Sequence, residues 1–299
     1  MQTNSTTTVH PLDPADAAAM VALREMTKPM KGLLRGVEAR PAFDDIMGHV
    51  PAPEGVTFEA DTVGGVSGWW CRPSSPVVGA AILYLHGGWY VWGTAAAYRN
   101  FVGHVAARSG IATFIADYRL APEHPFPAGL HDARGAYRGL IDLGLSRVAV
   151  VGDSAGGGLT LSLLSLLKDS SDVSPVGAVA FSPLTDMTLS GETWETKAEA
   201  DPFFTRSQGV ELAPLYLAGH DPKDPLVSPL FADLTGLPPI RIHVGEDELL
   251  LSDSTRLNGS NVQLDIWEGM PHVFLSSVGQ LAAAGHALDA VAAFLKAQI

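Results

Sequence analysis

The feature of this sequence that most constrains its fold is a series of short apolar runs separated by helical patterns. From the third run onward, most runs are continuously apolar, which is typical of strands that are covered on both faces. Helical patterns at about 95–108, 129–143 and 155–168 separate these runs and indicate right-handed crossovers between parallel strands. We therefore predict an α/β protein with an eight-stranded, mostly parallel sheet flanked by helices. The predicted strands are Val56–Glu59, Gly68–Cys71, Ala80–Leu85, Ile111–Ala116, Arg147–Val151, Ala178–Phe181, Ile240–Val244 and Val262–Trp267.

The two ends of the chain depart from this alternation. Gly64-Gly65 separates the first two runs, which favours an antiparallel hairpin at one edge of the sheet. A helix is expected to begin after Asp13-Pro14 and to end near Pro29, and it could either pack on the core or cover a site. A last helix, at about 277–297, carries an apolar stripe that faces the core.

Three stretches have no regular pattern. Residues 1–10 are polar, and we expect them to be mobile, whereas glycines and prolines predict an irregular path over 31–53. The alternation lapses again between Phe181 and Ile240, in a stretch rich in proline, aspartate and aromatic residues. We interpret this stretch as an insertion, and its part at about 186–220 as a cap.

Composition limits the partners that the chain can have. The formal net charge of −13 disfavours nucleic acids and anionic lipid surfaces, and no apolar run approaches the roughly 18 residues of a membrane span. The single cysteine, Cys71, and the absence of a signal-like first stretch fit a reducing compartment. The histidines show no metal-ligand spacing, so we expect no metal and no cofactor. We predict a soluble, cytoplasmic protein whose partner is a small molecule.

The stretch Val148 to Gly158 contains the most informative motif. An apolar run ends at Gly152-Asp153-Ser154-Ala155-Gly156, and a Leu-rich helical pattern follows at once. A Gly-x-Ser-x-Gly turn between strand and helix holds its serine in a strained conformation, with the hydroxyl group exposed at the end of the sheet. Ser154 is therefore the candidate nucleophile. A plain glycine-rich turn would look similar, so residues elsewhere must support this interpretation.

A serine hydroxyl group needs a base, an acid that orients the base, and donors for an oxyanion. In a parallel sheet such groups gather at the carboxyl ends of strands. The loop after the last predicted strand presents His272, which we take as the base. After the third predicted strand, Gly87 and Gly88 could direct N–H groups at a carbonyl oxygen together with the N–H of Ala155. His86, at the start of this loop, is interpreted as structural.

Four acids compete for the orienting role after the seventh predicted strand. Asp247 is the preferred candidate, because it lies in the turn at the end of the strand. Glu246 and Glu248 remain alternatives, and Asp253 is better explained as a charge in the first turn of a following helix. The chain order Ser154, Asp247, His272 is the order nucleophile, acid, base of α/β-hydrolases.

With these motifs, the sequence resembles the bacterial hormone-sensitive-lipase-like family of α/β-hydrolases, also called family IV esterases, over about residues 55 to 298. The resemblance implies an α/β-hydrolase fold over 51–299, a triad of Ser154, Asp247 and His272, and short acyl esters as substrates. It also implies that the N-terminal segment, 1–50, and the insertion jointly form a cap, and dimers are frequent among similar proteins. The matching motifs are His86-Gly87-Gly88, Asp117 to Glu123, Gly152 to Gly157, Ser182 to Asp186, Ser228-Pro229-Leu230, Asp247 and His272.

One position departs from the family pattern, which usually has a third glycine where this chain has Trp89. Trp89 could support the loop by packing on Trp92 or Tyr90, or it could narrow the site and limit the size of the substrate. We assign Trp89 and Tyr90 to the substrate pocket. The predicted function is a serine carboxylesterase that forms an acyl-enzyme. Hydrolysis of a lactone, an amide or an acetylated drug is the alternative, and a non-catalytic ligand receptor with this fold is a third reading.

Overall fold

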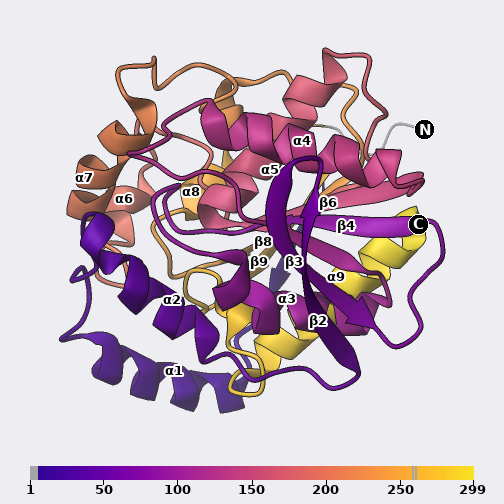
Figure 1. Cartoon of the computed structure of the whole chain (residues 1–299). Coiled ribbons are helices and arrows are strands. Elements are labelled where there is room, and N and C mark those ends of the chain that lie inside the picture. Colours follow the sequence, from indigo (N-terminus) through magenta and orange to yellow (C-terminus); the bar gives the residue numbers. More distant parts are fainter. Residues whose placement is uncertain (1–5, 258, 260) are drawn as a thin grey trace.

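The chain folds around one nine-stranded sheet, shown as a ribbon in Figure 1. The structure is a computed structural model and describes residues 6–257, 259 and 261–299. The strand order is β1-β9-β8-β7-β6-β4-β5-β3-β2, with β3 antiparallel to both of its neighbours and the other pairs parallel. The strands are β1 (Thr6–His10), β2 (Val56–Val63), β3 (Val66–Pro73), β4 (Ala80–Leu85), β5 (Thr113–Ala116), β6 (Arg147–Asp153), β7 (Ala178–Phe181), β8 (Ile240–Gly245) and β9 (Val262–Trp267).

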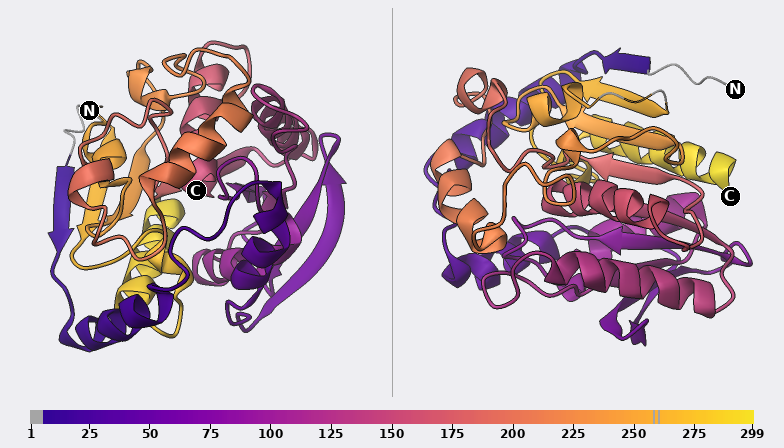
Figure 2. Two further views of the ribbon diagram at one scale, coloured as in Figure 1. Left: turned by 90° about the vertical axis from the view of Figure 1, so that its left-hand side faces the viewer. Right: turned by 90° about the horizontal axis from the view of Figure 1, so that it is seen from above.

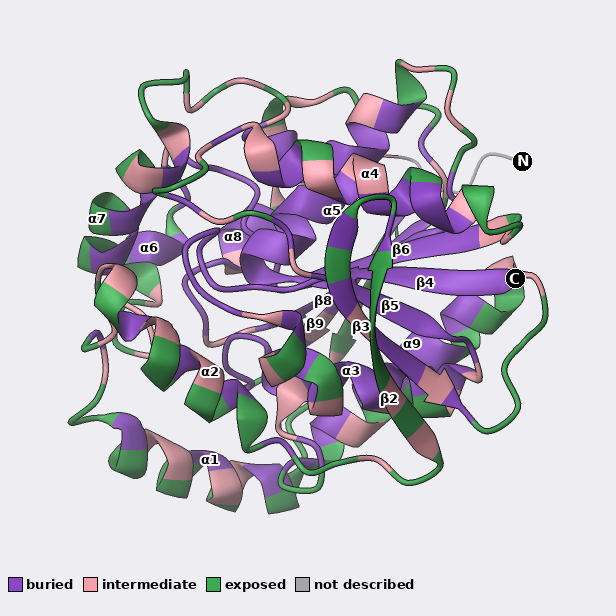
Figure 3. Ribbon diagram, in the orientation of Figure 1, coloured by how far each residue is buried: buried purple, intermediate pink, exposed green. Residues whose placement is uncertain are grey.

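The predicted mostly parallel α/β sheet is confirmed, and so is the edge hairpin, which is formed by β2 and β3. The central strands of the sheet are buried along their whole length because helices cover both faces of the sheet (Figure 3). This agrees with their continuous apolar runs. The helices are α1 (Pro14–Thr27), α2 (Arg40–Gly48), α3 (Ala95–Ser109), α4 (Ala128–Asp142), α5 (Ser154–Lys168), α6 (Thr193–Thr196), α7 (Arg206–Leu217), α8 (Leu251–Thr255) and α9 (Ala282–Gln298). Short 3₁₀ helices are η1 (Val37–Ala39), η2 (Pro229–Phe231) and η3 (Phe274–Ser276).

The helices form one layer on each face of the sheet. Helices α3 and α9 pack together on one face, and α4 and α5 pack together on the other (Figure 1). Helices α1, α2, α6 and α7, which we call the outer helices, gather at one end of the sheet (Figure 2). Among the described residues, no helix has the length and apolar character needed to cross a bilayer.

The expectation that residues 1–10 are mobile is wrong for residues 6–10, which form strand β1, whereas residues 1–5 lie outside the described residues. Strand β1 pairs in parallel with β9 and adds a ninth strand at the edge of the sheet. The His10 ring stacks on Trp267 with 3.9 Å between ring centroids, and His10 Nε2 lies 2.8 Å from Asp265 Oδ1. Three threonines and a valine favour an extended chain. Because these residues are mostly polar, their apolar pattern does not reveal the strand that they form at the edge of the sheet.

The expected irregular path over 31–53 is also wrong in part, because this stretch contains η1 and α2. Pro41 stands in the first turn of α2, where a helix has no need of its N–H group. Phe43 and Met47, one turn apart, are buried. Phe43 packs against the rings of Trp92 and Tyr98, at centroid distances of 5.6 and 6.3 Å. Pro41 therefore begins a helix and does not break one, contrary to the prediction.

The turn from β6 into α5 depends on glycines that lie against backbone atoms. A Cβ atom placed on Gly156 would lie 2.0 Å from the carbonyl oxygen of Leu85, at the end of β4. A Cβ atom on Gly152 would lie 2.3 Å from the carbonyl oxygen of Gly156. Helix α5 can therefore begin this close to the sheet only because side chains are absent at both positions.

We expect Gly156→Ala to lower the free energy of unfolding by about 1–3 kcal/mol, because the new methyl group meets backbone that cannot move aside. Gly285→Ala in α9 is the matched control, since a Cβ atom there meets nothing within 4 Å. The control should raise the free energy of unfolding by about 0.5–1 kcal/mol through helix propensity. Urea unfolding of both variants measures the two changes. Equal stabilities for the two variants would contradict the close approach of α5 to β4.

Candidate active site

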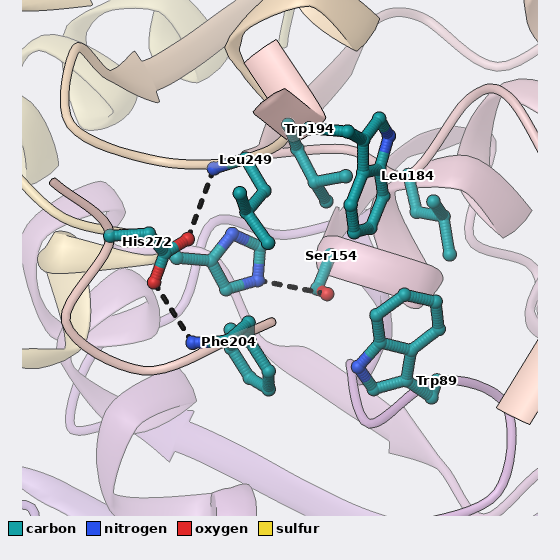
Figure 4. A pocket seen from close by; sticks show the side chains of 9 residues that line it. Trp89, Ser154, Leu184, Trp194, Phe204, Leu249 and His272 are labelled. Carbon is teal, nitrogen blue, oxygen red and sulfur yellow. Dashed lines mark hydrogen bonds between the residues drawn. The ribbon is translucent and has the colours of Figure 1, made fainter. Parts of the chain in front are cut away.

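The predicted nucleophile lies where strand β6 meets helix α5. Ser154 is the first residue of α5 and has a φ of 54°, in the left-handed region that non-glycine residues rarely adopt. Its side chain is directed towards His272 (Figure 4), and Ser154 Oγ lies 3.0 Å from His272 Nε2. Both residues are only 8% exposed. The strained turn therefore presents a buried hydroxyl group to an imidazole, as the Gly-x-Ser-x-Gly motif predicts.

Glu248 is the third residue in this series of hydrogen bonds after Ser154 and His272, because His272 Nδ1 lies 3.0 Å from Glu248 Oε1. The other carboxylate oxygen accepts hydrogen bonds from Ser182 Oγ at 2.7 Å and from the N–H of Gly245 at 2.9 Å. Glu248 is fully buried. A carboxylate at Nδ1 favours the tautomer in which Nδ1 carries the proton and Nε2 can accept one from Ser154.

The structure contradicts the prediction of Asp247 in this role. Strand β8 continues through Gly245, one residue further than predicted. The turn after it therefore presents Glu248, the residue after Asp247, to the imidazole. The Asp247 side chain faces the outer helices instead, where it accepts hydrogen bonds from Arg24 and Lys197. The turn and the acidic cluster were located correctly, but the position within the cluster was wrong by one residue.

Two opposing influences act on the imidazole of His272. Burial lowers the pKa of His272, whereas the charge and hydrogen bond of Glu248 and the nearby carboxylates of Asp201 and Asp153 raise it. The result is a pKa above the ordinary value of 6.5. The histidine is thus a stronger base than a free imidazole, which suits the removal of a proton from a hydroxyl group.

The loop after β4 is tied to the serine turn through Asp153. The Asp153 carboxylate accepts hydrogen bonds from Tyr84 Oη at 2.8 Å, from Tyr98 Oη at 3.1 Å and from the N–H of Gly87 at 3.1 Å. Burial raises the pKa of Asp153 to about 6 although these hydrogen bonds lower it. Gly87 therefore donates to a carboxylate, and its assignment as an oxyanion donor is wrong.

The next two residues of this loop are Gly88 and Trp89. Gly88 and Trp89 adopt φ angles of 110° and 59°, and the Gly88 carbonyl group accepts the N–H groups of Val91 and Trp92. Within the described part of the chain, the N–H groups of Gly88 and Trp89 have no hydrogen-bond partner. The N–H of Ala155 lies in the first turn of α5, where N–H groups have no partner inside the helix.

His86 has the structural role that was predicted for it. Its Nδ1 lies 2.8 Å from the carbonyl oxygen of Gly87, and its ring stacks on Tyr118 at a centroid distance of 4.4 Å. The Tyr118 hydroxyl group donates to the His86 carbonyl oxygen at 2.6 Å. The side chain is buried, and burial lowers the pKa of His86. His86 thus fixes the course of the loop and does not contact Ser154.

Ser154 and His272 face a narrow, mainly apolar cavity (Figure 4). Its free volume is about 10 Å³, room for about one water molecule. Trp194 of helix α6 and Phe204 after it line this cavity, so the insertion reaches Ser154 and His272. The lining residues are Trp89, Ser154, Leu184, Trp194, Asp201, Phe204, Leu249, Leu250 and His272.

The two predicted pocket residues, Trp89 and Tyr90, have different positions. The Trp89 ring lines the cavity, with centroid distances of 6.1 Å to Trp194 and 6.5 Å to Phe204, which favours the interpretation that it narrows the site. Tyr90 is not among the described residues that line this cavity. Its ring stacks on Tyr216 at 3.8 Å, so packing against α7 draws it away from the site. The assignment of Tyr90 to the pocket is therefore wrong.

Sequence reasoning also missed Asp201, which organises the wall of the cavity. Its carboxylate accepts the N–H groups of Phe203, Phe204 and Leu249 at 2.8 to 3.0 Å, and Figure 4 marks the bonds from Phe204 and Leu249. It is almost fully buried, and burial raises the pKa of Asp201. The Asp-Pro-Phe-Phe sequence, an aspartate before a turn in an apolar insertion, was the one available signal.

Comparisons with known proteins identify the family of this chain. The model of a family described as alpha/beta hydrolase fold matches residues 82–276. An acetyl-hydrolase of Streptomyces hygroscopicus is 35% identical over 268 residues, which cover 86% of this chain and 88% of the relative. An esterase of Acinetobacter venetianus is 31% identical over 230 residues, covering 76% of each chain.

Solved structures extend the likeness to the whole fold. The crystal structure of an esterase from the bacterial hormone-sensitive lipase family has a TM-score of 0.89 and 35% identity, and the match covers 96% of this chain and 99% of that one. The structure of the protein EstE5, soaked in ethyl alcohol, has a TM-score of 0.90 and 38% identity over the same shares of the two chains. The chain described here therefore belongs to the α/β-hydrolase-fold family, in the group of the bacterial hormone-sensitive-lipase-like proteins.

Proposed function

We propose that the protein is a serine carboxylesterase that hydrolyses esters of short carboxylic acids. The observation that carries this proposal is the continuous series of hydrogen bonds from Ser154 through His272 to Glu248 at the head of α5. Relatives named acetyl-hydrolase and esterase support the same chemistry. In this proposal Ser154 is the nucleophile, His272 the base and Glu248 the acid that orients it.

The proposed reaction has two halves. Ser154 Oγ attacks the ester carbonyl carbon while its proton passes to His272 Nε2, and the carbonyl oxygen becomes an oxyanion. The intermediate collapses when the bond to the alcohol oxygen breaks and His272 gives its proton to that oxygen. Water then attacks the acyl carbon while His272 takes its proton. The bond from that carbon to Ser154 Oγ breaks, His272 returns the proton to Oγ, and the carboxylic acid leaves. Glu248 holds the imidazole in the productive tautomer and stabilises its positive charge.

The oxyanion is assigned to the N–H groups of Gly88, Trp89 and Ala155. Support comes from the loop N–H groups, which have no hydrogen-bond partner among the described residues, and from the position of Ala155 in the first turn of α5. The helix dipole there also favours negative charge. Gly87 takes part indirectly, because its hydrogen bond to Asp153 holds the loop beside the serine turn. One such donor contributes about 2.7–4 kcal/mol to transition-state stabilisation.

We further propose that the outer helices form the cap over the site, from the segment 1–50 and the insertion at about 186–220. The cavity lies between the serine turn and this cap, and three aromatic rings, those of Trp89, Trp194 and Phe204, occupy most of the space above Ser154. Because this space holds about one water molecule, even an acetyl group requires a small shift of these rings. Longer acyl chains require displacement of an aromatic side chain.

Replacement of the nucleophile tests the proposal as a whole. Hydrolysis of p-nitrophenyl acetate by Ser154→Ala should fall by at least about 10³-fold, because no other group can form the acyl-enzyme. A fluorophosphonate probe should label the wild-type protein and leave this variant unlabelled. Undiminished hydrolysis in the variant would reject the mechanism, and the absence of labelling and turnover in the wild-type protein would favour a receptor with this fold.

Glu248→Gln and Asp247→Asn together test which acid orients the histidine. The base must be neutral, so kcat/KM should fall as pH decreases through the pKa of His272, which lies above 6.5. Glu248→Gln removes the charge that raises this pKa, so the acid limb should move to lower pH while the plateau falls by about 10²–10⁴-fold. Asp247→Asn should leave the acid limb in place. The opposite pattern, a shifted limb only in Asp247→Asn, would restore Asp247 as the orienting acid.

Trp89→Gly and Tyr90→Phe test the origin of the acyl preference. Removal of the indole should raise kcat/KM for p-nitrophenyl octanoate relative to the acetate by about 10-fold, because space opens beside Ser154. Tyr90→Phe should leave this ratio unchanged, since its ring lies against Tyr216. A series of p-nitrophenyl esters from acetate to decanoate measures both variants. An unchanged preference in Trp89→Gly would show that other cavity walls limit the acyl chain.

A further inference from the structure

Asp247 lies where three distant segments of the chain meet. Its Oδ2 accepts a hydrogen bond at 2.5 Å from Arg24, in helix α1, and its Oδ1 accepts one at 3.2 Å from Lys197, directly after α6. Lys197 Nζ also lies 3.6 Å from Glu246. Two cations of the outer helices thus hold one anionic turn at the end of β8.

This cluster of Arg24, Lys197 and Asp247 is directly connected to both loops that carry the proposed acid and base. Asp247 precedes Glu248 in the chain, and its N–H donates to the carbonyl oxygen of Met270 at 3.0 Å, two residues before His272. Arg24 also donates to the carbonyl oxygen of Gly269 at 3.3 Å. A movement of α1 therefore pulls on both loops at once.

The two cap segments are bound to each other as well as to this turn. Arg35 Nη1 lies 2.7 Å from Glu211 Oε2, which joins the N-terminal segment to α7. Gln208, also in α7, donates to the carbonyl oxygen of Leu34 at 2.8 Å. Because the segments are tied together, the contacts of Arg24 and Lys197 act on the cap as a whole.

The small volume of the cavity connects these contacts with the entry of the substrate. With free volume for about one water molecule, the cavity admits a substrate only when its aromatic walls are displaced. Trp194 and Phe204, which form these walls, lie within seven residues of Lys197 in the same insertion. Holding Lys197 to Asp247 therefore resists the displacement that a bulky acyl chain needs.

We propose that Asp247 is a positioning residue that acts as an electrostatic latch between the cap and the loops of Glu248 and His272. When the latch is closed, it holds the cap against these loops and keeps the cavity small; when it is open, larger acyl groups enter. This inference rests on the proposed esterase function. Asp247 contacts neither Ser154 nor the cavity, so it acts only through its neighbours.

The latch differs from a merely stabilising ion pair in its response to salt. The side chains of Arg24, Lys197 and Asp247 are 35%, 23% and 20% exposed, so dissolved ions can screen their attraction. Screening should loosen the cap without any mutation. An ion pair with a purely structural role would change the stability of the fold and leave the preference for acyl groups as it is.

The test compares Asp247→Asn, Arg24→Met and the double variant with the control Asp289→Asn, which breaks the ion pair between Arg108 and Asp289 on α3 and α9. The ratio of kcat/KM for p-nitrophenyl octanoate and acetate is measured at about 0.01 M and about 1 M NaCl, where the Debye length changes from about 30 to about 3 Å. In the wild-type protein and the control, high salt should raise this ratio about 3–10-fold. In Asp247→Asn the octanoate-to-acetate ratio should be high at both salt concentrations. The double variant should have the same ratio as Asp247→Asn.

Hydrogen exchange supplies a readout that does not depend on turnover. Backbone amides of α6 and residues 197–205 should exchange several-fold faster in Asp247→Asn than in the wild-type protein or in Asp289→Asn. Unchanged exchange together with an unchanged, salt-independent ratio would overturn the latch while leaving the esterase in place. Failure of the esterase itself would appear as hydrolysis that does not depend on Ser154, and the exchange measurement would then still decide whether Asp247 holds the cap.

Discussion

The buried carboxylate of Asp153 is the contact on which the geometry of the site depends. A buried charge is unfavourable unless hydrogen bonds compensate for the lost water, and Asp153 has three, from two tyrosines and from the N–H of Gly87. Asp153 immediately precedes Ser154, so the same carboxylate ties the serine turn to the loop after β4. The proposed nucleophile and the proposed oxyanion donors are thereby held beside each other.

A parallel sheet explains why residues so far apart in sequence could be assigned to one site before the fold was known. Ser154, Glu248 and His272 follow strands β6, β8 and β9, and the carboxyl ends of parallel strands lie at the same edge. The location of each loop could thus be predicted. The choice between Asp247 and Glu248 could not, because it depends on whether β8 ends before or after Gly245, a difference of one residue that apolar patterning does not resolve.

The same limit explains which parts of the fold were predicted and which were not. Buried strands such as β4 and β7 have the predicted bounds, because burial on both faces leaves a continuous apolar run. Strand β1 is exposed and polar, and only its pairing with β9 and the stacking of His10 on Trp267 reveal it. The prediction of Gly87 as an oxyanion donor is wrong for a related reason. Its N–H group donates to the buried carboxylate of Asp153, and this contact depends on the tertiary fold.

The substitution of Trp89 for a third glycine connects the loop geometry with the proposed selectivity. A residue at this position needs a positive φ, which costs a tryptophan backbone strain that glycine does not have. The strain is tolerated because the indole packs with Trp194 and Phe204 from the insertion, so that the loop and the cap stabilise each other. The aromatic rings that fill the cavity and the cluster of Arg24, Lys197 and Asp247 then act together on the access of the substrate. The rings set how much space an acyl group finds, and the ion pairs set how readily that space enlarges.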